Sequence, residues 1–182
     1  MNQLLLFLAP GFEEIEAITT IDVLRRAGLN VLSVSITGDH RVVGAHSIAI
    51  ETDCLYPEID FDEADMLILP GGQPGTKNLN VHEGLKAALT NFSKAGKPLA
   101  AICAAPMILG QLGILDGKEA TCYPGNEVYL KGATLSKRRV VRDGSVITAA
   151  GPGMAIKFAL EIVNFFLGEE KSEEIVKDFL LK

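Results

Sequence analysis

The sequence predicts an α/β fold in which a parallel β-sheet lies between layers of helices. Short apolar segments occur at residues 4–9, 31–36, 66–69 and 99–102, and all but 31–36, which contains two serines, are apolar throughout. They alternate with longer segments in which apolar residues recur with the period of a helix. A parallel strand is buried on both faces and so is apolar throughout, and a helix usually connects one such strand to the next.

In the first half of the chain, we expect strand, helix, strand, hairpin and strand at residues 4–9, 13–27, 31–36, 42–50 and 66–69. Gly28 ends the helix, because glycine readily adopts the left-handed conformation that follows a helical C-terminus. The hairpin places short strands at 42–43 and 48–50 around Gly44. A Pro-Gly-Gly sequence at 70–72 ends the last strand.

In the second half, we expect helix, strand, hairpin and two helices at residues 81–95, 99–102, 140–148, 154–167 and after 172–174. Asp143 and Gly144 form a typical hairpin turn between strands at 140–141 and 146–148. No internal repeat or linker interrupts this order. The 182 residues therefore fit one domain, spanning 1–182.

Composition and charge disfavour several classes of protein. No apolar segment approaches the roughly 18 residues that cross a bilayer, and the N-terminus lacks the basic leader of a signal peptide. The net charge of −6 argues against a dedicated nucleic-acid partner. A basic cluster at 137–139, with Arg142 nearby, is explained by a solvated sheet edge.

The cysteines and histidines indicate a reducing compartment and no metal. The three cysteines, Cys54, Cys103 and Cys122, form no CxxC pair and leave at least one thiol unpaired, which favours the cytoplasm. The three histidines are His40, His46 and His82. They are scattered, without the spacing of metal ligands, so we expect no metal site.

Cys103 is the first candidate for chemistry. It follows the apolar strand at 99–102, and the small residues Ala104 and Ala105 precede a helix-like segment that starts at Met107. This pattern predicts a sharp strand-to-helix turn that presents a thiol, as in the nucleophile elbow of hydrolases. The N–H groups and dipole of a helix N-terminus favour the thiolate. The alternative is that Cys103 is a small, buried hydrophobic residue.

Glu16 is the second candidate, because it lies on the face that its helix should bury. At about 100° per residue it shares a stripe with Thr20, Val23 and Ala27. Burial raises the pKa of a carboxyl group, and a protonated Glu16 beside a thiolate can donate a hydrogen bond to sulfur and transfer a proton. The alternative is that Glu16 only complements the helix dipole, as Glu13 and Glu14 are expected to do.

The Pro-Gly-Gly turn offers a third component. Glycines let a backbone approach a ligand closely and expose N–H groups. We expect the N–H groups of Gly72 and Ala104 to form an oxyanion site next to Cys103, with Gly71 in the same turn. The alternative is an ordinary tight turn. On the outer face of the first helix, Ile15 and Ile18 indicate a subunit interface.

These residues together resemble the ThiJ/PfpI superfamily, in the branch of the DJ-one and YajL proteins. The matching segments are residues 8–16, 22–28, 67–72, 100–106 and 151–153, in the order and spacing of the family. The resemblance implies a flavodoxin-like sandwich, similar to class I glutamine amidotransferases, that forms a homodimer. It also implies a cofactor-free site in which Cys103 is the nucleophile and redox centre, Glu16 hydrogen-bonds its sulfur, and Gly72 and Ala104 line an anion pocket.

Two departures from the family pattern bear on function. The protease-like branch has a histidine after the cysteine, where this chain has Ala104, so a peptidase is disfavoured. The animal members have a pocket histidine at the position that matches Tyr123. Tyr123 is suited to donate a hydrogen bond to a substrate carbonyl, but its high pKa makes it a poor base. The alternative is that Tyr123 is a packed aromatic at the pocket rim.

Three functions remain after this comparison. The first is a glyoxalase or deglycase that acts on 2-oxoaldehydes such as methylglyoxal through Cys103 and Glu16. The second is an oxidative-stress sensor or redox-regulated chaperone in which peroxide converts Cys103 to the sulfinate. The third is a dimeric scaffold with a vestigial pocket, which the presence of Cys103 and Glu16 argues against.

Overall fold

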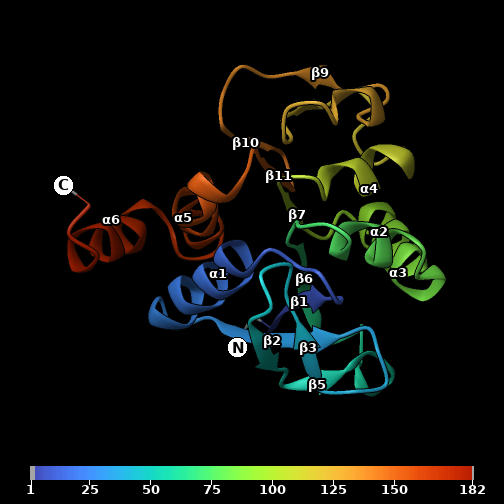
Figure 1. The fold of residues 1–182 in the computed structure, drawn as a ribbon. Helices are drawn as coiled ribbons and strands as arrows, with labels where there is room; N and C mark the ends of the chain where they lie inside the picture. Colours follow the sequence, from blue (N-terminus) through green and yellow to red (C-terminus); the bar gives the residue numbers. More distant parts are fainter. Residues whose placement is uncertain (1–2, 182) are drawn as a thin grey trace.

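The computed structural model describes residues 3–181 and confirms the α/β fold, with a seven-stranded sheet at its centre (Figure 1). The strand order is β10-β11-β7-β6-β1-β2-β5. Neighbouring strands run parallel, except that β10 is antiparallel to β11. The strands are β1 (Gln3–Leu8), β2 (Asn30–Ser35), β5 (Cys54–Leu55), β6 (Ala64–Leu69), β7 (Leu99–Ile102), β10 (Val140–Asp143) and β11 (Val146–Ala149).

Helices cover both faces of this sheet. On one side lie α1 (Glu14–Arg26), α5 (Ala155–Leu167) and α6 (Glu169–Asp178); on the other lie α2 (Gly75–Asn80), α3 (Glu83–Lys94) and α4 (Pro106–Gln111) (Figure 1). The central strand β1 shows why the sheet is buried on both faces. Leu4, Leu6 and Leu8 pack in the core beneath α1 and α5, whereas Leu5 and Phe7 pack in the core beneath α3 and α4. All five are fully buried, and each contributes roughly 1.5–3 kcal/mol to folding.

Most predicted elements, including the helix expected at 81–95, are confirmed within one or two residues, but the short helix before it was not predicted. Residues 75–80 form a separate helix, α2, and α3 begins at Glu83. His82 caps α3, because its Nδ1 accepts a hydrogen bond from the N–H of Leu85 at 3.0 Å. Val81 lies between the two helices and is 72% exposed.

Over the described residues, the C-terminal helix and two small two-stranded sheets complete the fold. Helix α6 begins at Glu169, so Ser172 lies within it and not before it as predicted. The predicted hairpin at 42–50 is confirmed as β3 (Arg41–Val43) and β4 (Ala49–Glu51). No local pattern predicted the two-residue pair β8 (Glu119–Ala120) and β9 (Thr134–Leu135), nor β5.

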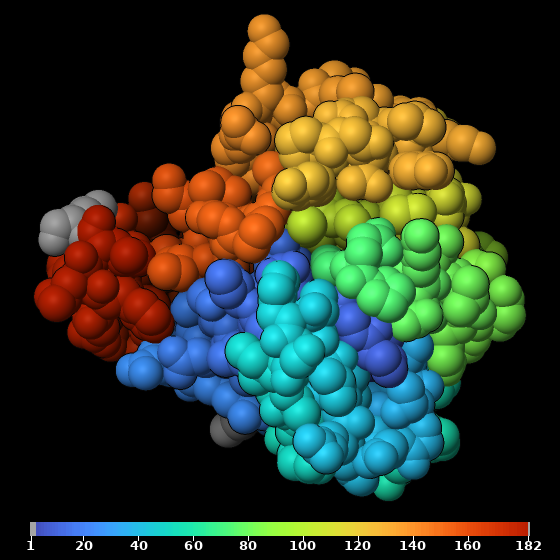
Figure 2. All heavy atoms as spheres, viewed as in Figure 1, coloured from blue at the N-terminus to red at the C-terminus, as the bar shows by residue number. Residues whose placement is uncertain are grey.

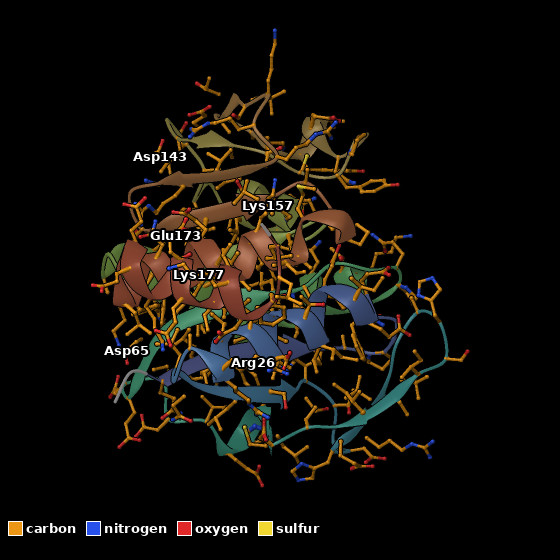
Figure 3. The ribbon with its side chains drawn as sticks, turned by 90° about the vertical axis from the view of Figure 1, so that its left-hand side faces the viewer. Arg26, Asp65, Asp143, Lys157, Glu173 and Lys177 are labelled. Atoms are coloured by element: carbon orange, nitrogen blue, oxygen red, sulfur yellow. The ribbon has the colours of Figure 1, made fainter. Side chains whose placement is uncertain are left out.

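Charged side chains project from the outer surface of the α5–α6 layer. Figure 3 shows Lys157, Glu173 and Lys177 on this surface, above the end of α1 that carries Arg26. This side of the molecule has the expected arrangement of an apolar inner face and a polar outer face. Over residues 3–181, every helix is too short or too polar to cross a bilayer.

Candidate functional site: a cysteine and a glutamate at the strand ends

The carboxyl ends of β1, β6 and β7 meet at one edge of the sheet, as predicted for a doubly wound fold. Strand β1 lies between β2 and β6, so the chain changes direction across the sheet beside β1. Such switch points are where open α/β sheets bind ligands. The turns are joined directly: the N–H of Glu13 donates to the carbonyl of Gly71 at 2.9 Å, and the N–H of Gly75 donates to the carbonyl of Gly11 at 3.0 Å. Figure 2 shows the blue, green and yellow segments that carry these turns meeting near the centre of the face.

Cys103 occupies the sharp turn between β7 and α4. Its φ is 65°, a left-handed conformation that non-glycine residues seldom adopt. The turn is held on both sides, since the Cys103 N–H donates to the Ala149 carbonyl at 2.8 Å and the Cys103 carbonyl accepts from the Tyr123 N–H at 2.7 Å. Strain of this kind costs about 1–3 kcal/mol and is typical of functional sites. The predicted elbow is therefore confirmed.

Glu16 is buried against this elbow. Its side chain is 0% exposed, as the stripe on α1 predicted. Oε2 accepts a hydrogen bond from the Gly71 N–H at 2.7 Å, whereas the buried Oε1 accepts none within residues 3–181. Burial raises the pKa of Glu16 to about 7, despite the lowering effect of the bonds with Gly71 and Cys103. A carboxyl oxygen that accepts nothing is suited to carry the proton that this pKa retains.

Gly71 has a different role from the one predicted. Its N–H is directed to Glu16 and its carbonyl accepts from Glu13, so Gly71 is a positioning residue and not an oxyanion donor. A Cβ at this position would lie 2.6 Å from Cys103 Cβ and 2.8 Å from Glu16 Oε2. Only glycine leaves space for the cysteine and the glutamate to meet here.

The protonation states of Cys103 and Glu16 depend on each other. Burial, the negative charge of Glu16 and the hydrogen bond with Glu16 raise the pKa of Cys103 to about 12, while the N–H groups of Ala104 and Gly72 lower it. The backbone N–H groups therefore favour the thiolate as expected, but burial and the ionised Glu16 outweigh them. Two of the raising causes vanish when Glu16 holds its proton. The pair therefore shares one proton and one negative charge at pH values just above 7.

A cavity of about 580 Å³ opens over the sulfur. Cys103 lines it and is 8% exposed, so the thiol is reachable from solvent. Gly72 and Ala104 also line it, and their N–H groups approach the sulfur, as predicted for an oxyanion site. Tyr123 stands at the rim with 47% of its surface exposed. The sequence did not predict the remaining polar lining, which includes Glu13, Gln73, Lys77 and Asn126.

A second acidic group near the cavity was assigned wrongly from the sequence. Glu14 does more than complement the helix dipole, because it is 4% exposed and its Oε1 accepts from the His46 N–H at 2.7 Å. Its Oε2 lies 2.9 Å from His46 Nδ1. Burial alone would raise the pKa of Glu14, but the hydrogen bonds from His46 and Ile48 outweigh it and lower the pKa. Glu14 thus fastens the β3–β4 turn to α1.

This contact also bears on the expectation that the protein has no metal site. Ligand atoms of Glu13, Glu14 and His46 lie within 4.8 Å of one another. Both Glu14 oxygens are already bonded to His46, and the Glu14 hydrogen bond raises the pKa of that imidazole. The group therefore functions as an ion-paired anchor for the turn, and metal binding would have to break it.

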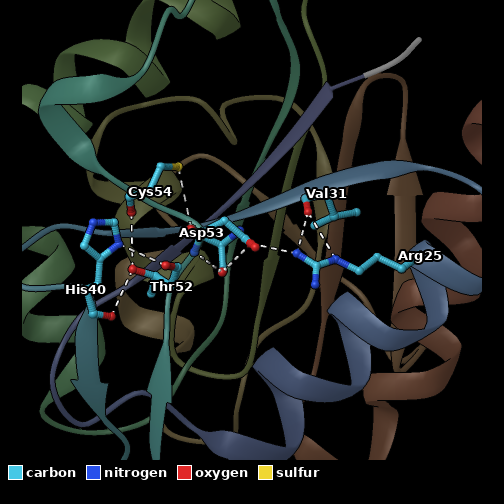
Figure 4. Close-up of polar contacts among 7 residues, drawn as sticks. Arg25, Val31, His40, Thr52, Asp53 and Cys54 are labelled. Carbon is cyan, nitrogen blue, oxygen red and sulfur yellow. Dashed lines mark hydrogen bonds and ion pairs between the residues drawn. The ribbon is translucent and has the colours of Figure 1, made fainter.

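The other two cysteines lie in different surroundings. Cys54 is on the edge strand β5, and its Sγ donates to the Ser33 carbonyl at 3.7 Å, beside the ion pair of Asp53 with Arg25 (Figure 4). Cys122 is 6% exposed. Burial raises the pKa of each thiol to about 11. All three cysteines are free thiols, and of the three only Cys103 lines the cavity.

The fold and site define a class: an α/β protein with a cysteine on a strand-to-helix elbow and a buried acid beside its sulfur. Comparison with known proteins supports this class. Residues 2–165 match the DJ-1/PfpI family, and the chain belongs to that family.

Related proteins extend this match over nearly the whole chain. Protein dj-1beta of Drosophila melanogaster is 36% identical over 97% of this chain and 96% of its own length. A protein of Pyrococcus abyssi named a deglycase is 33% identical over 88% of this chain and 97% of its own. The structure of oxidized DJ-1 from Toxoplasma gondii superposes with a TM-score of 0.94 at 31% identity, covering 99% of this chain and 98% of that one. The predicted superfamily and flavodoxin-like fold are confirmed.

Proposed function

We propose that this protein is a cofactor-free enzyme that uses Cys103 and Glu16 to act on reactive 2-oxoaldehydes, as a glyoxalase or deglycase. The observation that carries the proposal is the pair itself: a buried acid with a raised pKa in contact with a strained cysteine beneath an open cavity. The relative named a deglycase supports the same class of chemistry.

The first step forms a covalent adduct. The Cys103 sulfur attacks the aldehyde carbon, a C–S bond forms, and the carbonyl electron pair moves to oxygen. The N–H groups of Gly72 and Ala104 are placed to stabilise that oxyanion. Glu16 then gives its proton to the oxygen, which completes the hemithioacetal and leaves Glu16 as a carboxylate.

The second step moves hydrogen within the adduct. The Glu16 carboxylate removes the proton from the former aldehyde carbon, and the C–H electron pair forms an enediolate with the adjacent carbonyl. Glu16 returns this proton to the adjacent carbon, while the hydroxyl proton on the former aldehyde oxygen passes to the neighbouring oxygen. The hemithioacetal of methylglyoxal thereby becomes a lactoyl thioester. Water hydrolyses the thioester to lactate and restores the thiol. The net reaction therefore adds one water to methylglyoxal and needs no external oxidant or reductant. Tyr123 is placed at the rim to donate a hydrogen bond to the substrate ketone.

The test is lactate formation from methylglyoxal by purified protein. Cys103→Ala should abolish turnover, and Glu16→Gln should impair it while Cys103 is still alkylated. Cys54→Ala is the matched control, because Cys54 lies outside the cavity and its loss should leave turnover intact. Wild-type turnover no faster than that of a variant without cysteines would end the proposal.

A second candidate is a redox sensor, favoured by the position of Cys103 as the one cysteine on the cavity among residues 3–181. Peroxide would oxidise the sulfur to the sulfenate and a second peroxide to the sulfinate, each releasing one water. Mass spectrometry after mild peroxide treatment separates the candidates. Selective oxidation of Cys103 with negligible aldehyde turnover favours sensing, whereas equal oxidation of Cys54, Cys103 and Cys122 argues against a special site.

We also propose that the protein acts as a homodimer in a reducing cytoplasm. Ile15 and Ile18 on α1 are 57% and 43% exposed, and Ile48 on the neighbouring β3–β4 turn is 53% exposed. Glu14 joins this turn to α1, so the three apolar side chains belong to one surface region. An apolar surface of this kind is suited to a second copy of the chain.

A further inference from the structure

A cationic side chain lines the catalytic cavity of a protein that is acidic overall. The chain carries a net charge of −6, yet Lys77 on α2 lines the same cavity as Cys103. Within residues 3–181, no carboxylate pairs with the Lys77 ammonium group. Among the described residues, six other basic side chains form ion pairs with carboxylates, whereas the Lys77 ammonium group forms none and is therefore available to a ligand.

Other groups on the cavity wall also favour an anion. The N–H groups of Gly72 and Ala104 point toward the sulfur. Glu13 is the one carboxylate on the wall, and His46 Nδ1 lies 3.6 Å from its Oε1. Arg139 lines an adjoining hollow that shares Tyr123, Pro124 and Pro152 with the catalytic cavity. Lys77 and Arg139 thus place two cationic groups around the mouth of the site in a protein that is negative overall.

The cavity is also larger than a three-carbon aldehyde requires. Its volume of about 580 Å³ is within the range of sites that enclose whole small molecules. A substrate with its aldehyde at Cys103 thus has space for a further group on the side of Lys77. One unpaired ammonium matches a group with one negative charge, whereas a phosphate carries about −1.5 to −2 at pH 7.

We propose that the preferred substrates are 2-oxoaldehydes that carry a carboxylate, with Lys77 as the residue that selects it. This inference rests on the proposed function and names its substrate class. The carboxylate forms an ion pair with the Lys77 ammonium group while the aldehyde carbon lies over the Cys103 sulfur. The preference is electrostatic, so it weakens as salt screens the charges.

The first test compares kcat/KM for 4,5-dioxopentanoate with kcat/KM for its methyl ester, which has the same dicarbonyl and no charge. Wild-type protein should prefer the acid by about threefold to fivefold, the range of a partly exposed ion pair. Lys77→Gln should bring the ratio close to one, Lys77→Glu should invert it, and Lys77→Arg should restore most of it. Lys94→Gln on α3 makes the same change in net charge away from the cavity and should keep the wild-type ratio. A ratio unchanged in Lys77→Gln would overturn the proposal.

The second test does not depend on turnover. It compares the rates at which anionic iodoacetate and neutral iodoacetamide alkylate Cys103. The iodoacetate-to-iodoacetamide ratio should fall about threefold to fivefold in Lys77→Gln and stay at the wild-type value in Lys94→Gln. If neither dicarbonyl is consumed but this ratio still depends on Lys77, the proposed enzyme function fails and the anion preference holds. If the ratio does not depend on Lys77, the anion preference fails.

Discussion

Replacing Gly71 by alanine tests whether close packing brings the cysteine and the glutamate together. The added methyl group would lie 2.6 Å from Cys103 Cβ, 2.8 Å from Glu16 Oε2 and 3.1 Å from Cys103 Sγ. None of these atoms is the far end of a flexible, solvent-exposed side chain, because Glu16 is fully buried and Cys103 is held by its backbone bonds. The pair must therefore separate.

The size of the effect follows from this overlap. Overpacking a well-packed interior costs about 1–3 kcal/mol. For a chain of this length, about 2 kcal/mol lowers the Tm by roughly 4–8 °C. Displacing a reacting group by about an ångström reduces a rate by about tenfold to a hundredfold. Thermal unfolding followed by circular dichroism measures the first effect, and the rate of Cys103 alkylation at neutral pH measures the second.

Gly38→Ala is the matched control. Gly38 does not have a positive φ, and a Cβ there meets no atom within 4 Å. We expect its stability to stay the same or to rise by up to about 1 kcal/mol, with wild-type alkylation of Cys103. If Gly71→Ala behaves like Gly38→Ala in both assays, the proposed steric role of Gly71 is refuted.

Three other changes give separate tests. Because the pKa of Glu16 is raised from 4.5 to about 7 in the folded protein, its proton stabilises the fold below pH 4.5, and about 3 kcal/mol is lost as the pH rises through 7. The free energy of unfolding in urea, measured from pH 4.5 to 8, should show this loss in the wild type but not in Glu16→Gln. Parallel plots of this free energy against pH for the two proteins would contradict the prediction. Ile18→Lys should shift sedimentation from dimer to monomer, whereas Val81→Lys, which changes a more exposed apolar side chain far from α1, should not. Tyr123→Phe should lower kcat for methylglyoxal by about tenfold through loss of one hydrogen bond to the substrate, and an unchanged kcat would make Tyr123 a packing residue only.

The sequence predicted the elements whose local pattern matches their final environment. Residues 4–8 are apolar throughout because both faces of β1 are covered, and Glu16 is recognisable because it interrupts an apolar stripe. The helix predicted at 81–95 was started two residues too early, because the spacing of apolar residues does not show where a helix begins. The cap at His82 is a contact between a side chain and a backbone N–H, which the period does not encode.

The parts of the site that were missed depend on contacts between distant residues. His46 is 32 positions from Glu14, and nothing in either local segment indicates that they meet. The role of Gly71 was misjudged for a similar reason, since the direction of its N–H is set by Glu16, 55 positions away. The raised pKa of Cys103 likewise follows from burial and a neighbouring charge that no short segment reveals.

The most direct measurement of the central claim is the rate of Cys103 alkylation by iodoacetamide as a function of pH, in wild type and in Glu16→Gln. If Glu16 and Cys103 share one proton, the pair loses its first proton near pH 7, the pKa to which burial brings Glu16. A fraction of the pair then holds the remaining proton on Glu16 and the charge on sulfur, so the wild-type rate should rise through a midpoint near 7, below the value of about 8.5 for a free cysteine. That midpoint should disappear in Glu16→Gln. A wild-type midpoint above about 8.5, or the same profile in both proteins, would contradict a thiol activated by its neighbouring acid.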